Sequence, residues 1–207
     1  MILFTFIFLV IGLHIIFALK KPGHVGSLAQ IKEEEMNASL ARKKDINPEY
    51  FVTVDTSHLP IKEYGPSHQN EKVALLQSKV CTNAQKTMIR LPKPMRNVDI
   101  KLAFGVANLE VVIQYEENYN RYILSLINWA EELKNTGLPD EAETVLKESV
   151  SLGSDVSKSY TLLADIYSES KQHQKLKELA DHMENPETLT QNQEFKQKML
   201  RYIKEQL

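Results

Sequence analysis

Residues 126–183 read LINWAEELKNTGLPDEAETVLKESVSLGSDVSKSYTLLADIYSESKQHQKLKELADHM, and this stretch decides the fold. Apolar and small residues recur in it at a spacing of 34 residues, so that Trp129 corresponds to Leu163 and Ala130 to Ala164. A fixed period of roughly 20–50 residues is typical of proteins built from stacked repeats. The stretch therefore predicts two helical units of like design, and with them a surface that binds another protein.

Start and stop signals divide this part of the chain into helices. Apolar residues at steps of three and four predict one long helix from about Asn108 to Thr136. Gly137 and Gly153 end helices, and Pro139 lies near the start of one. The helices that follow the long one are predicted at residues 138–152, 156–170 and 172–184, with a capping helix from 185 to 207. Short connections between them favour antiparallel hairpins, and the fold class is all-α.

The pattern resembles the tetratricopeptide repeat family. The residues that carry the resemblance are Trp129, Ala130, Leu133, Gly137, Ala142, Leu146, Leu163, Ala164 and Tyr167. The resemblance implies that small residues at Ala130 and Ala142 let paired helices approach closely, while large ones fill the space between repeats. The second unit departs from the pattern, because Leu176 stands where a small residue is expected and Lys171 stands where the turn glycine is expected.

The resemblance also implies a partner groove on the first helix of each unit. By the repeat register its residues are Leu124, Ile127, Glu131, Lys134, Lys158, Thr161, Asp165 and Glu169. Family members that bind chaperone tails carry Lys and Asn at the positions of Ile127 and Glu131, so that activity is not expected here. The acids Glu131, Asp165 and Glu169 suggest a basic peptide as partner; the alternative is a plain solvated surface.

The amino-terminal residues 1–19 predict a transmembrane anchor. They read MILFTFIFLVIGLHIIFAL, and as a helix they would span about 28 Å, close to the thickness of a bilayer core. No charged side chain precedes the stretch and its exit is a poor cleavage site, so we expect it to stay uncleaved. Lys20 and Lys21 follow it directly, which places the folded part in the cytoplasm by the positive-inside rule. An exported domain behind a signal anchor is the alternative.

The chain between the anchor and the repeats is predicted to have two parts. Residues 20–50 form a tether with a short helix near 28–40. Residues 51–106 hold an extended arm, 51–64, and a packing helix that runs from 67 to about 88. No second strand is evident for the arm, so we expect it to lie along the helices. The remaining residues, 107–207, make up the repeats and their cap.

Composition and motifs favour a binding protein over an enzyme. Residues 1–106 hold 14 Lys and Arg against 9 Asp and Glu, whereas residues 107–207 hold 11 against 18, a distribution expected of a basic half near anionic lipid. There is a single cysteine, Cys81, and the six histidines have no metal-ligand spacing. No nucleotide, nucleophile or nucleic-acid motif is present. We therefore expect no catalytic residue, cofactor or metal. The expected function is that of an adaptor or scaffold at the cytoplasmic face of a bacterial membrane. The alternatives are an exported factor in envelope assembly and an enzyme whose site is not recognisable.

Overall fold

The computed structural model describes residues 27–65, 68–185 and 192–207. Most of these residues are helical, which confirms the all-α class. The predicted anchor, residues 1–19, lies outside the described residues. Among the residues that are described, no helix is both long and apolar enough to cross a membrane.

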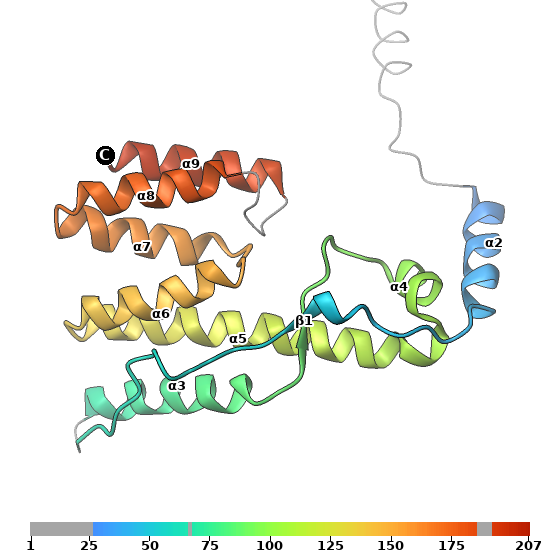
Figure 1. The fold of residues 1–207 in the computed structure, drawn as a ribbon, viewed down its shortest axis with the longest axis horizontal. Coiled ribbons are helices and arrows are strands. Elements are labelled where there is room, and N and C mark those ends of the chain that lie inside the picture. The colour runs from blue at the N-terminus through green and yellow to red at the C-terminus, as the bar shows by residue number, and fades with distance from the viewer. Residues whose placement is uncertain (1–26, 66–67, 186–191) are drawn as a thin grey trace, which may run out of the picture.

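The helices and strands follow one another along an elongated molecule (Figure 1). The α-helices are α2 (Leu28–Ser39), α3 (His68–Ala84), α4 (Asn97–Phe104), α5 (Leu109–Asn135), α6 (Pro139–Ser151), α7 (Ser157–Glu169), α8 (His173–Glu184) and α9 (Gln193–Glu205). The 3-10 turns η1 (Pro48–Tyr50) and η2 (Val106–Asn108) and the strands β1 (Phe51–Val52) and β2 (Met88–Ile89) complete the fold.

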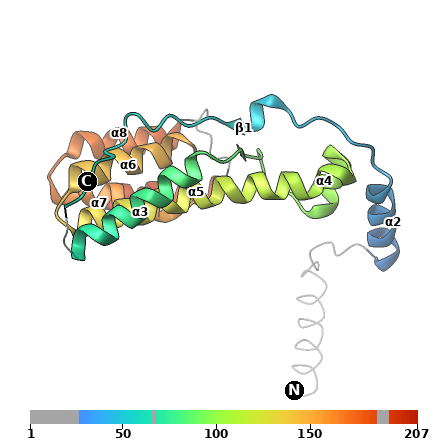
Figure 2. The ribbon, with the colours of Figure 1, turned by 90° about the horizontal axis from the view of Figure 1, so that it is seen from below.

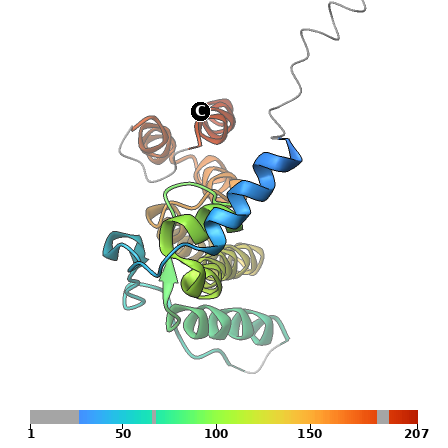
Figure 3. The same ribbon diagram turned by 90° about the vertical axis from the view of Figure 1, so that its right-hand side faces the viewer.

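The long helix α5 is the axis of the molecule. Its carboxyl-terminal half packs on α6, and α7, α8 and α9 stack beyond α6, each in contact with the one before it. Helix α3 covers the opposite side of α5, and α2 and α4 lie at its amino-terminal end (Figures 1 and 2). Viewed along α5, the helices form successive layers from α3 to α9 (Figure 3).

Left-handed residues make the turns between the stacked helices. Gly137 has φ +80° and lets the Leu138 N–H donate to the carbonyl of Leu133 over 2.9 Å, which closes the end of α5. Gly153 does the same after α6, at φ +77°. Lys171, at φ 56°, is the one described non-glycine residue with positive φ, and it stands at the turn where the repeat pattern expects glycine. The chain thus keeps the turn and accepts strain for it.

The main core lies between α5 and its neighbours. Trp129, Leu126 and Tyr122 of α5 are fully buried, as is Tyr160 of α7. The predicted cap packs there too, since the Tyr160 ring meets Phe195 of α9 edge to face, with centroids 5.5 Å apart. Burial of large aromatic side chains is the dominant stabilising term in such a core. The predicted boundaries of α5 to α8 agree with the observed ones to within a residue, whereas the cap begins at Gln193 and not at residue 185 as predicted.

Part of the predicted tether is folded. The Lys44 N–H donates to the Phe104 carbonyl over 3.0 Å, and Ile46 and Tyr50 pack on a second small core around Phe104 and Ile100. Helix α2 packs against α4. Residues 41–50 therefore pack against the helices, which their polar sequence does not indicate.

The extended arm does have a partner strand. Phe51 pairs with Ile89 and Val52 with Met88 in an antiparallel ladder. The expectation of an unpaired arm was wrong because α3 ends at Ala84, earlier than predicted, and frees Met88 and Ile89 to pair. Beyond the ladder, the arm lies on the main core as expected, with Leu59 buried.

Candidate functional site

The eight predicted groove residues lie on α5 and α7, and they differ in exposure. Ile127 is 1% exposed and belongs to the core, so it does not line a groove, contrary to the prediction. Leu124 is 47% exposed, and Thr161 is half-buried. The remaining five residues are charged, and each has a partner within the molecule.

Two ion pairs cross from α5 to α7 on this face. Lys158 Nζ lies 2.6 Å from Glu131 Oε1, and Lys134 Nζ lies 2.7 Å from Glu169 Oε1. Exposed pairs of this kind are worth about 0–1 kcal/mol, so they contribute little to stability. Their effect on recognition is larger, because two of the three acids expected to attract a basic peptide already face a lysine.

The third acid, Asp165, is directed at the cap. Tyr202 of α9 donates its hydroxyl hydrogen bond to Asp165 Oδ1 over 2.6 Å. This hydrogen bond, with burial, raises the pKa of Tyr202 to about 12. Asp165 therefore helps to hold α9 against α7, a role that the repeat register could not predict.

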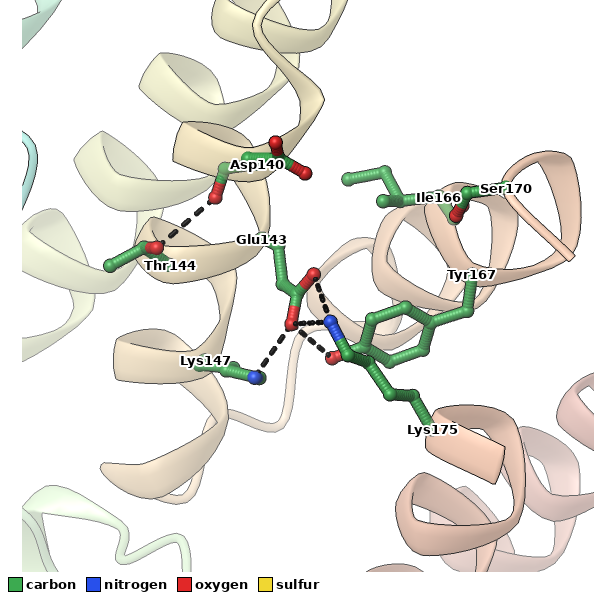
Figure 4. A network of polar contacts seen from close by, with 8 residues as sticks. All are labelled: Asp140, Glu143, Thr144, Lys147, Ile166, Tyr167, Ser170 and Lys175. Carbon is green, nitrogen blue, oxygen red and sulfur yellow. Dashed lines mark hydrogen bonds and ion pairs between the residues drawn. The ribbon is translucent and has the colours of Figure 1, made fainter. Parts of the chain in front are cut away.

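A buried carboxylate joins α6, α7 and α8 (Figure 4). Glu143 is 6% exposed and accepts hydrogen bonds from Tyr167 at 3.2 Å and from Lys175 at 2.9 Å, and it pairs with Lys147 at 2.6 Å. Burial raises the pKa of Glu143, but the hydrogen bonds from Lys147 and Lys175 outweigh burial and leave the pKa below its usual value. Sequence analysis missed this network, although Glu143 is one helical turn before Lys147.

A cleft of about 410 Å³ opens between the loop after β2 and the amino-terminal ends of α7 and α9. Its lining contains both basic and acidic side chains. The lining residues are Arg90, Leu91, Pro92, Lys93, Pro94, Glu116, Tyr119, Asn120, Asp155 and Asn192. Nothing in the local sequence shows that the basic residues Arg90 and Lys93 face α5.

Hydrogen bonds fix the walls of this cleft. Tyr119 donates to the Leu152 carbonyl over 3.0 Å, and Asn118 donates to the Thr87 carbonyl over 3.0 Å. Burial raises the pKa of Tyr119 to about 12 and also raises the pKa of the Glu116 carboxyl. The cleft thus presents a fixed mixture of donors and acceptors, which suits the polar backbone and side chains of a peptide.

The cleft adjoins the predicted face through one ridge of α5. Glu116, Asn120 and Leu124 are each four residues apart, so they lie on one ridge of the helix. Asn120 and Leu124 are exposed. The ridge therefore runs from the cleft toward the ion pairs with α7.

Within the described ranges, no group of three or more His, Cys, Asp and Glu side chains is arranged to hold a metal ion. Comparisons of the chain with family models, with curated proteins and with solved structures gave no match.

Proposed function

We propose that this chain is a membrane-anchored adaptor of the tetratricopeptide type, which binds another protein at the cytoplasmic face of a bacterial membrane. The stacking of α5 to α9 supports the repeat assignment, because each helix contacts the next in chain order. The small residues Ala130, Ala142 and Ala164 are fully buried, as close approach of paired helices requires. Trp129 and Leu146 fill the space beside them.

The observation that carries the proposal is the exposed ridge of α5 beside the polar cleft. A protein partner needs an exposed apolar contact with hydrogen-bonding groups around it. Leu124 offers the exposed apolar contact, and Asn120, Arg90 and Asp155 of the cleft offer the hydrogen-bonding groups. The paired acids on α5 and α7 make a peptide of mixed charge a better fit than a purely basic one.

A photo-crosslinking amino acid at position 124 of the full chain, in its own membrane, tests this surface. Lys177 on α8 is exposed and gives the matched control position. We expect a discrete adduct from position 124 that is absent from position 177. The adduct should weaken when Arg90 and Asp155 are both replaced by Ala. Equal adducts from both positions, or none from position 124, would overturn the proposal.

Membrane sidedness is a separate part of the proposal and has its own test. Ser154, a natural choice for a labelling site, is buried, so the cysteine is better placed at Lys177 in a Cys81→Ser background. A membrane-impermeant thiol reagent should leave intact cells unlabelled and label them after permeabilisation. Labelling of intact cells would instead establish the exported factor in envelope assembly.

A further inference from the structure

Helix α2 carries a stripe of large apolar side chains that no other described part of the chain covers. Leu28, Met36 and Leu40 are 79%, 59% and 76% exposed. With Lys32 they are spaced four residues apart, so they share one ridge of the helix. Soluble surfaces seldom leave several large apolar side chains so exposed together.

The other side of α2 is occupied by α4. Ala38 is fully buried there. Glu34 lies 3.6 Å from Arg96, and Glu35 pairs with Lys101. These contacts fix the rotation of α2, so the apolar ridge faces away from the molecule's own core.

The position of α2 in the chain points to the occupant. Only seven residues, 20–26, separate the apolar stretch 1–19 from Ser27, the N-cap of α2, and seven residues reach at most about 25 Å. If the anchor spans the bilayer, α2 must therefore start close to the membrane surface. Helices α2 and α4 also form the end of the molecule that lies furthest from the stacked helices α6–α9 (Figures 1 and 2).

Charge around the ridge is complementary to anionic lipid. Lys32 lies within the ridge, and Arg42, Lys43 and Lys44 are exposed directly after α2. The acids Glu34 and Glu35 are paired with Arg96 and Lys101, whereas Glu33 lies at the margin of the ridge. A lysine in an apolar ridge can extend its stem along lipid and keep its ammonium group among the phosphates.

We infer that α2 lies in the headgroup layer of an anionic bilayer, with Leu28, Met36 and Leu40 toward the acyl chains. The inference rests on the membrane anchor of the proposed function and adds a second contact beside it. Two contacts orient the body, because a single span alone would leave the stack of helices free to swing. The bilayer would then hold the α5 ridge in a fixed orientation toward its partner.

Lipid-depth quenching on the full chain in nanodiscs tests the inference. In a Cys81→Ser background, a fluorophore is attached at Ser39→Cys, beside the ridge, or at Asn37→Cys, on another side of α2. Both residues are exposed, and since they are only two positions apart, their distances along the chain from the anchor are nearly the same. Spin-labelled lipid should quench position 39 at least about twofold more than position 37, since only the ridge enters the bilayer.

Two variants and one change of lipid complete the design. Replacing Met36 and Leu40 by Gln should abolish the difference between the two positions, whereas Leu75→Gln, at an exposed apolar residue of α3, should not. Replacing anionic lipid by phosphatidylcholine should reduce quenching at position 39. Equal quenching at position 39 in the two lipids would overturn the anionic-lipid assignment.

The outcomes separate this inference from the anchor. A chain that fails to co-purify with nanodiscs overturns the anchor and the inference together. A chain that co-purifies but shows equal quenching at positions 37 and 39 overturns the inference alone.

Discussion

Replacement of Glu143 by Ala should destabilise the stacked helices strongly, because three helices share this one carboxylate. The hydroxyl of Tyr167, 3% exposed, would lose its acceptor, at a cost of about 1–3 kcal/mol. Lys175 and Lys147 are 39% and 56% exposed and can return to water, so their lost pairing adds at most about 1 kcal/mol. We expect the free energy of unfolding to fall by roughly 1–4 kcal/mol in total.

Urea unfolding of the full chain in mild detergent measures this loss. Trp129 is the single tryptophan and is fully buried, so its fluorescence reports on the core between the helices. Glu184→Ala is the matched control, since Glu184 and its partner Lys204 are both about half exposed. That control should change stability by less than about 1 kcal/mol.

A double-mutant cycle then isolates the buried hydrogen bond. Tyr167→Phe alone should cost about 1 kcal/mol, and it should cost nearly nothing in the Glu143→Ala background, because the hydroxyl is then already without its partner. Additive losses, or a Glu143→Ala variant as stable as the control, would refute the reasoning.

The same carboxylate gives a pH dependence of known sign. The folded-state pKa of Glu143 lies below its usual value of 4.5. The contribution of Glu143 to the free energy of unfolding is therefore fully present above its pKa in the unfolded chain, and it is lost as the pH falls through its pKa in the folded chain. The stability difference between the wild-type chain and Glu143→Ala should stay constant from pH 7 to about 5 and shrink below that. A difference that grew on acidification would contradict the assignment.

Further predictions concern turns and the cap, all measured by the same urea titration. Lys171→Gly should raise stability by about 1 kcal/mol, because the residue adopts φ 56° and glycine does so without steric cost; an unchanged midpoint would count against it. Gly105→Ala should destabilise the chain more than Gly137→Ala. Both glycines have positive φ, so both substitutions carry a conformational cost of about 1–2 kcal/mol, but only at Gly105 would the new Cβ lie 2.4 Å from a carbonyl oxygen, that of Arg42. Equal losses of stability would be inconsistent with that contact. Tyr202→Phe should cost about 1 kcal/mol through the lost bond to Asp165, and a neutral outcome would show that α9 does not depend on it.

The helices of the stack could be predicted from sequence because their signals are local. Steps of three and four between apolar residues set the length of α5, and Gly137 with Pro139 marks the junction to α6. Lys171 departs from the repeat pattern in sequence, because glycine is expected there, and its positive φ shows that the backbone still adopts the conformation that favours glycine.

What sequence analysis missed depends on residues far apart in the chain. The ladder between β1 and β2 is two residues long on each side, too short for a periodic signal. Lys158 finds Glu131 only after α7 has folded back beside α5, so a list of groove residues could not show that their charges are paired. The cleft likewise appears only when the loop at Arg90 is placed next to α5.

Zero-length coupling of lysines to carboxylates, read by mass spectrometry on the full chain, tests the central claim most directly. That claim is that α5 and α7 lie side by side and form one face of a helical stack. The account predicts amide links between Lys158 and Glu131 and between Lys134 and Glu169, whose atoms lie 2.6 and 2.7 Å apart. Absence of both links, in a sample where Lys204 still couples to Glu184, would contradict it.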